Sequence, residues 1–154
     1  MRGIGRTARA AALLGATLAA AAATAPTAFA DTGLETSSGS CSAGAYFANY
    51  SVTYDQLINN PTDRVDGVDW TIGGPVGTHN NVEVRVKYDN SRGHDPIYYT
   101  WISGDDVQGG DTFLDWRTEG IEVPTAKPMY VEFKFTFDVP GEGDKSCTGH
   151  TRNV

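Results

Sequence analysis

The chain has 154 residues and carries 19 acidic side chains against 12 basic ones, so its formal net charge at pH 7 is −7. This balance excludes nucleic acids and anionic membrane surfaces as partners, because both require a basic footprint. A basic protein or a cation stays compatible with it. The length suits one domain with one hydrophobic core.

Residues 1–30 have the layout of a secretory signal peptide. Arg2, Arg6 and Arg9 form a basic start, an alanine-rich apolar run follows, and Ala-Phe-Ala ends at Ala30 as a cleavage site. The run is too short and too rich in alanine for a membrane span, which needs about 20 clearly apolar residues. Its style resembles secreted proteins of high-GC Gram-positive bacteria. We therefore predict a secreted, extracellular bacterial protein that does not insert into a membrane after cleavage.

Cleavage would leave residues 31–154 and remove three arginines but no acid, so the charge of this portion becomes about −10. Residues 31–40, DTGLETSSGS, are small and polar and predict a flexible N-terminal tail. The folded domain is expected to span residues 41–154. Its two cysteines, Cys41 and Cys147, predict a disulfide that ties both ends of the domain, because an exported chain meets an oxidising space. Free thiols or pairing with another chain are the alternatives.

Along residues 41–154, apolar side chains recur at every second position, which is the spacing of half-buried β-strands. The clearest strands are AYFANYSVTYD, NVEVRVKYD and MYVEFKFTFDV, with weaker ones at residues 68–72, 97–102, 112–118 and 121–123. Turns rich in glycine and proline separate them, and no stretch supports a long amphipathic helix. This pattern predicts an all-β fold, a single antiparallel β-sandwich with immunoglobulin-like, Greek-key topology.

The stretch YYTWISGDDVQGGD, residues 98–111, joins three large rings to a loop with three aspartates and three glycines. In a strand over residues 97–102, Ile97, Tyr99 and Trp101 would share one face, and the opposite face would carry Tyr98. An exposed ring there suits contact with a protein or a sugar, because it offers a large area at low entropy cost. The alternative is that the rings belong to the core and the aspartates to an ordinary turn.

These residues and their neighbours form the predicted binding surface of a non-enzymatic interaction module. Rings would supply contact area, and charges would supply orientation. In outline the chain is similar to small exported bacterial sandwich proteins that act as inhibitors, ligand-binding modules or adaptor subunits. A secreted or cell-surface protein is the first expected partner, and a glycan is the second. Glycan binding fails if all three tryptophans are buried. The candidate residues are Tyr98, Trp101, Asp105, Asp106, Trp116, Arg92 and His94.

No catalytic residue, metal ion or cofactor is predicted. The three histidines, His79, His94 and His150, lack the spacing of a metal site. Calcium at the aspartates of residues 105–111 is an alternative to a plain turn. A small hydrolase is the alternative from another class. It would use paired carboxylates, either Asp89 with Asp95 or Asp106 with Asp111.

Overall fold

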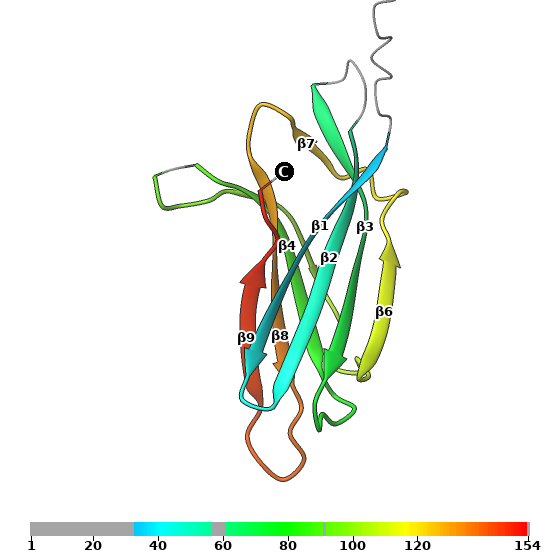
Figure 1. Ribbon diagram of the computed structural model, residues 1–154, viewed down its shortest axis with the longest axis vertical. Helices are drawn as coiled ribbons and strands as arrows, with labels where there is room; N and C mark the ends of the chain where they lie inside the picture. The colour runs from blue at the N-terminus through cyan, green and yellow to red at the C-terminus, as the bar shows by residue number, and fades with distance from the viewer. Residues whose placement is uncertain (1–32, 57–60, 91, 154) are drawn as a thin grey trace, which may run out of the picture.

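The computed structural model describes residues 33–56, 61–90 and 92–153, which form two antiparallel β-sheets packed face to face (Figure 1). The predicted signal peptide, residues 1–30, lies outside these ranges. No helix that could cross a bilayer occurs within them. The first sheet has the order β1 (Leu34–Ala43), β2 (Tyr46–Gln56), β3 (Thr62–Gly73), β6 (Gly110–Asp115), and β7 (Glu122–Pro124) also pairs with β3; the second has the order β5 (Ile97–Ile102), β4 (Asn81–Tyr88), β8 (Met129–Phe137), β9 (Lys145–His150).

The strand order confirms the predicted sandwich and its topology. The chain crosses from β3 to the second sheet, forms the hairpin of β4 and β5, and returns to pair β6 with β3. It then crosses again, so that β8 lies between β4 and β9. The second sheet therefore has the C′-C-F-G order of an immunoglobulin-like sandwich, and β2, β3 and β6 have the A-B-E order. Strand β1 is an addition in front of this arrangement.

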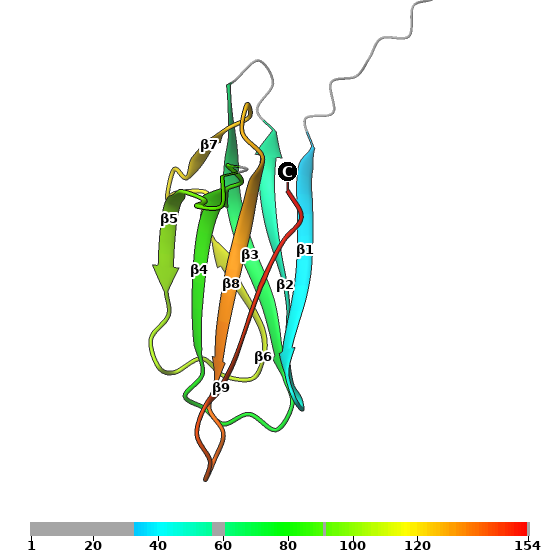
Figure 2. The same cartoon turned by 90° about the vertical axis from the view of Figure 1, so that its left-hand side faces the viewer.

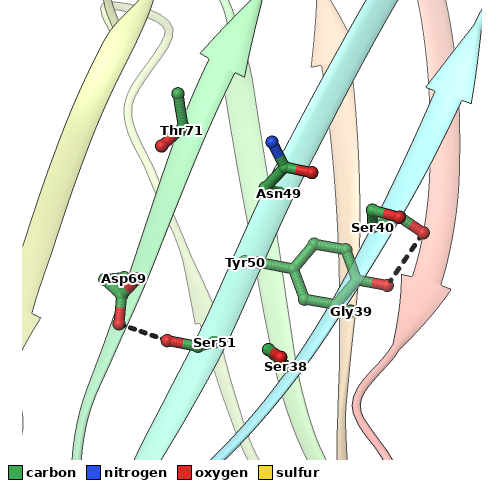
Figure 3. A pocket seen from close by; sticks show the side chains of 8 residues that line it. All are labelled: Ser38, Gly39, Ser40, Asn49, Tyr50, Ser51, Asp69 and Thr71. Atoms are coloured by element: carbon green, nitrogen blue, oxygen red, sulfur yellow. Dashed lines mark hydrogen bonds between the residues drawn. The ribbon is translucent and has the colours of Figure 1, made fainter.

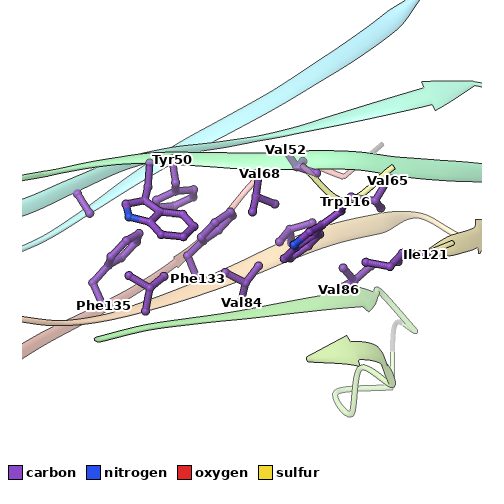
Figure 4. Close-up of a cluster of buried hydrophobic side chains, with 14 of the residues drawn as sticks. Tyr50, Val52, Val65, Val68, Val84, Val86, Trp116, Ile121, Phe133 and Phe135 are labelled. Atoms are coloured by element: carbon purple, nitrogen blue, oxygen red, sulfur yellow. The ribbon is translucent and has the colours of Figure 1, made fainter. Parts of the chain in front are cut away.

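The core lies between the two sheets and consists of the alternating apolar rows expected from the sequence. Figure 4 shows side chains of the first sheet facing those of the second, with Trp116 and Ile121 among them. Alternation places one side of each strand in this layer and leaves the other side wet. The rows predicted for the three clearest strands are buried at Ala48, Tyr50, Val52, Tyr54, Val82, Val84, Val86, Met129, Val131, Phe133, Phe135 and Phe137.

The prediction of a flexible tail over residues 31–40 is wrong from Leu34 on. Residues 34–43 form β1, which pairs with β2 along its whole length, from Leu34 opposite Asp55 to Ala43 opposite Tyr46. Cys41 therefore lies inside a strand, not before the first one. The polar composition led to the wrong prediction because β1 is an edge strand, held mainly by backbone hydrogen bonds. Among the serines and threonines of β1, only Ser37 is buried. Residues 31 and 32 lie outside the described ranges.

The side of the sandwich formed by β1 and β9 is sealed, and we call it the closed edge. The predicted disulfide between Cys41 and Cys147 is present, with a Cα–Cα distance of 5.7 Å. The Ser37 hydroxyl donates to the carbonyl of Arg152 at 3.1 Å. Glycine at position 149 lets the two strands approach the Tyr50 ring between them, because a Cβ there would lie 2.1 Å from the Tyr50 hydroxyl.

This close approach leads to a prediction for Gly149→Ala. The added methyl group overlaps the Tyr50 hydroxyl, so we expect the free energy of unfolding to fall by about 1–3 kcal/mol. In a Tyr50→Phe background the overlapping atom is absent, and the same alanine should cost much less. Urea denaturation of the four proteins of this double-mutant cycle measures the coupling. An equal cost in both backgrounds would contradict the close approach.

The opposite side of the sandwich is formed by β5 in the second sheet and by β6 and β7 in the first, and we call it the open edge. Figure 2 shows β5 at the margin of its sheet. Ring contacts join the two sheets behind it, between Trp70 and Trp101 and between Tyr99 and Trp116. Four of the six large apolar side chains exposed among the described residues lie on β5 and β6.

Candidate functional site

The backbone of β5 offers unused hydrogen-bonding groups along the open edge. Among the described strands, β5 pairs with β4 alone. The N–H of Ser103 donates to the carbonyl of Val82 at 2.9 Å, so the alternation of an antiparallel ladder directs the N–H and C=O groups of Thr100 and Ile102 away from β4. Such a row of outward groups is a template for another strand.

Exposed apolar side chains accompany this row. The exposed fractions are 52% for Ile97, 40% for Tyr98 and 65% for Ile102. Tyr99 and Trp101 are half-buried and pack against the core, as their predicted row requires. The expectation that Ile97 joins that row is wrong, because the pairing with β4 slips at Tyr98 and forms a β-bulge. A β-bulge changes the direction in which nearby side chains point, and here Ile97 and Tyr98 are both exposed.

Tyr98 is held at the surface by an aromatic and cationic cluster. Its ring lies 5.5 Å from the ring of Tyr88, measured between centroids. The ammonium group of Lys127 lies 4.2 Å from the centroid of Tyr88 and donates to the Tyr98 hydroxyl at 3.4 Å. This hydrogen bond raises the pKa of Lys127. A ring fixed in this way loses little further freedom when a partner covers it.

The charged candidates lie at opposite ends of β5. Arg92 and His94 precede the strand and are exposed, whereas Asp105 and Asp106 follow it and are also exposed. Six residues of strand separate the two groups by about 20 Å. The structure therefore does not gather the predicted residues into one patch. Arg92 shares its loop with Asp89 and Asp95, so the end of β5 before Ile97 carries charges of both signs, whereas the end after Ile102 carries two aspartates.

Trp116 does not lie on the surface, so the exposed position expected for it is wrong. It follows β6, and its side chain turns into the core with an exposed fraction of 3%. The backbone N–H of Trp116 donates to the carbonyl of Asp66. The backbone N–H of Val65 donates to the carbonyl of Ile121, so the chain is again hydrogen-bonded to β3 just before β7 begins. Trp70 is buried as well. Trp101 alone is partly accessible, so the three tryptophans form no exposed coplanar platform for a sugar.

One predicted carboxylate pair does meet in a pocket. Asp89 and Asp95 line a hollow of about 280 Å³ together with Tyr130, Glu132, His150 and Asn153. The carboxylate of Asp95 accepts a hydrogen bond from the Tyr130 hydroxyl at 2.6 Å, and this bond lowers the pKa of Asp95. Burial, and then the same bond, raises the pKa of Tyr130. The pKa of Asp95 is therefore lowered, so this carboxyl does not have the raised pKa that the general acid of glycoside hydrolysis needs.

The second predicted pair is not brought together as a site. Asp111 accepts a hydrogen bond from the Thr71 hydroxyl on the outer face of the first sheet, and Asp106 lies beside Gly104 in the loop before β6. That loop connects the two sheets rather than closing a hairpin. Within the described ranges, no three histidine, cysteine or acidic side chains are placed to hold a metal ion.

A polar hollow of about 460 Å³ lies on the outer face of the first sheet, over β1, β2 and β3 (Figure 3). Short side chains leave this space open, and the Ser51 hydroxyl donates to Asp69 within it. Sequence reasoning missed this hollow, because each of its residues taken alone is typical of the solvent-exposed face of a strand. Its lining is Ser38, Gly39, Ser40, Asn49, Tyr50, Ser51, Asp69 and Thr71.

Comparisons with family models, with curated proteins and with solved structures found no match for this chain. Within the described part of the chain, the open edge combines outward backbone groups, exposed apolar side chains and charged residues in the adjoining loops. We therefore treat it as the candidate functional site.

Proposed function

We propose that the chain is a secreted, non-enzymatic interaction module that docks an extended strand of a protein partner along β5. The main support for this proposal is that backbone N–H and C=O groups of β5 point away from β4, next to the exposed side chains of Ile97, Tyr98 and Ile102. In this mode, main-chain hydrogen bonds contribute affinity, and alternate side chains contribute specificity. The disulfide is consistent with an oxidising, extracellular location.

The composition of β5 supports docking rather than passive exposure. Natural proteins protect free edges with charged residues, proline or a covering segment. Residues 97–102, IYYTWI, contain no charged residue, glycine or proline. By contrast, β6 begins with glycine and carries Asp111 and Asp115, and the closed edge is sealed by a disulfide. An unprotected strand of this kind is an aggregation hazard unless a partner covers it.

Substitutions on the edge should abolish capture of the partner. When a tagged chain is used as bait in culture supernatant, we expect to recover one protein in stoichiometric amount. An untagged copy of the chain counts as such a protein. Ile102→Lys places a charge in the docking row, and Thr100→Pro removes an outward N–H; both should lose the captured protein. Quantitative mass spectrometry of the eluate measures the recovery.

Leu34→Lys is the matched control. Leu34 is 62% exposed, close to the 65% of Ile102, but lies on β1 in the other sheet. It should retain full capture. Equal recovery by the edge variants and this control would refute docking at β5. Retention of Ile102→Lys on a polysaccharide column as strong as that of the unaltered chain would support the glycan alternative instead.

A further inference from the structure

We propose that the outer face of the first sheet binds an uncharged polysaccharide. Strand β5 belongs to the other sheet, so this inference adds a second binding activity and does not rest on the proposed function. The centre of the face is the polar hollow of about 460 Å³ over β1, β2 and β3 (Figure 3). We call the outward side of β1, β2, β3 and β6 the hydroxyl face, because four serine and threonine side chains line this hollow.

Strand pairing places the polar side chains of the hydroxyl face in two level rows. Residues opposite each other in an antiparallel sheet point to the same side. The rows are Ser40 with Asn49 and Thr71, and Ser38 with Ser51 and Asp69. These side chains are short, so an extended ligand can lie close to the sheet and contact both rows at once.

Hydrogen bonds within the hydroxyl face leave it rich in acceptors. The Ser51 hydroxyl donates to Asp69, and the Thr71 hydroxyl donates to Asp111. Both hydroxyl protons are used inside the sheet, whereas the oxygens of these four groups keep lone pairs that can accept from a ligand. The complementary ligand therefore carries many O–H donors. A polysaccharide meets this requirement, because each sugar unit carries several hydroxyl groups.

The charges of the hydroxyl face disfavour an anionic ligand. Strands β1, β2, β3 and β6, all of whose residues the structure describes, contain one basic residue, Arg64. Its guanidinium group pairs with Asp55 and Asp66. A carboxylated or sulfated polymer would therefore meet Asp69 and Asp111 with no basic residue of these strands left to offset the repulsion. An uncharged polysaccharide avoids this repulsion and still uses the acceptors.

Two exposed phenylalanine rings of the hydroxyl face offer surfaces for stacking. The exposed fractions are 43% for Phe47 and 60% for Phe113. A Cβ on Gly73 would lie 2.3 Å from Cζ of Phe47, and a Cβ on Gly67 would lie 3.0 Å from the ring of Phe113. Each ring thus lies over a glycine of β3, which supports it from below. Its outer side stays accessible to the apolar face of a sugar.

The two rings stand at opposite corners of the hollow. Phe47 precedes Asn49 on the outward side of β2, and Phe113 on β6 lies opposite Asp69. The spacing of residues and strands in a sheet places the Cα atoms of the two phenylalanines about 16 Å apart. A polysaccharide that crosses the hollow diagonally can therefore stack on both rings and offer hydroxyl groups to the rows between them.

Affinity electrophoresis of the chain tests the class of ligand. Native gels contain starch, galactomannan, mixed-linkage β-glucan or dextran as uncharged polymers, and polygalacturonate as an anionic one. We expect at least one uncharged polymer to slow the chain and polygalacturonate to leave its mobility unchanged. Unchanged mobility in every uncharged polymer overturns the inference, and so does slowing by polygalacturonate that equals or exceeds theirs.

Substitutions at exposed positions test the place of binding without changing the charge. Phe113→Ala removes a ring and Asn49→Ala removes an amide from the hollow, so each should raise the dissociation constant of the retarding polymer about three- to tenfold. Ile102→Ala is the matched control, because Ile102 is 65% exposed but lies on β5. It should bind the polymer as the unaltered chain does. Thermal unfolding followed by circular dichroism shows whether each variant is folded.

Unchanged binding in both Phe113→Ala and Asn49→Ala overturns the placement on the hydroxyl face, and so does binding that is lost in Ile102→Ala. The proposed function is read out separately. Ile102→Lys should keep the polysaccharide and lose the captured protein, whereas Phe113→Ala should do the reverse, so the two proposals fail independently.

Discussion

Replacing Cys41 and Cys147 by alanine is expected to lower the free energy of unfolding by about 4 kcal/mol. The disulfide joins residues 106 positions apart, so in the chain-entropy model it removes a large amount of freedom from the unfolded chain. It also fastens β1, a polar edge strand that contributes little apolar burial, to β9 in the other sheet. Because domains of this size are stable by about 5–15 kcal/mol, this loss is a large part of the total.

Urea denaturation of three forms measures the effect: the oxidised chain, the reduced chain and the double alanine variant. The reduced chain and the variant should have nearly the same stability, since both lack the cross-link. Hydrogen exchange should show the largest loss of protection in β1, where the clamp is released. A change below about 1 kcal/mol would mean that the backbone pairing of β1 with β2 holds the closed edge without help.

The fold class was predictable because the inner rows of β2, β4 and β8 alternate without a break. A two-residue period specifies which face of a strand is buried, and strands with one buried face in a short chain leave few architectures. The disulfide was predictable from the even pair of cysteines and the predicted export. Each of these inferences needs only local patterns or composition.

Features set by pairing with a distant strand were not predictable. Strand β1 carries no apolar alternation, and it is a strand because β2 offers it an edge. The bulge at Tyr98 arises from the fit between β5 and β4, and it moves Ile97 out of the row that strict alternation assigns to it. In both cases the deciding partner lies elsewhere in the sequence, so a window around the residue holds no signal.

The candidate site was predicted in part. The sequence pointed to the rings of residues 97–102 and to the charged loops on either side. It did not show that the strand separates Arg92 from Asp105, so these charges do not form one pocket. The sequence paired Asp89 with Asp95, but it did not show that Tyr130 and His150 line the same pocket, because these two residues come from β8 and β9.

The structure separates two tryptophans that the sequence placed in the same binding set, and Trp116→Ala is the substitution that tests this separation. The Trp116 side chain fills the core between the sheets, where its ring meets Tyr99 edge-on at 5.3 Å between centroids. We expect the free energy of unfolding to fall by about 3–5 kcal/mol, since truncating a buried tryptophan leaves a large cavity. Trp101→Ala removes a half-buried ring, so it should cost less.

Capture of the partner distinguishes a core role from a contact role. At a temperature where calorimetry shows Trp116→Ala to be folded, it should bind through β5 as the unaltered chain does, because its side chain does not reach the open edge. Ile102→Lys should behave in the opposite way, with stability preserved and docking lost. Trp116→Ala with unchanged stability and no capture would place this ring in the interface and would require the turn between β6 and β7 to open on binding.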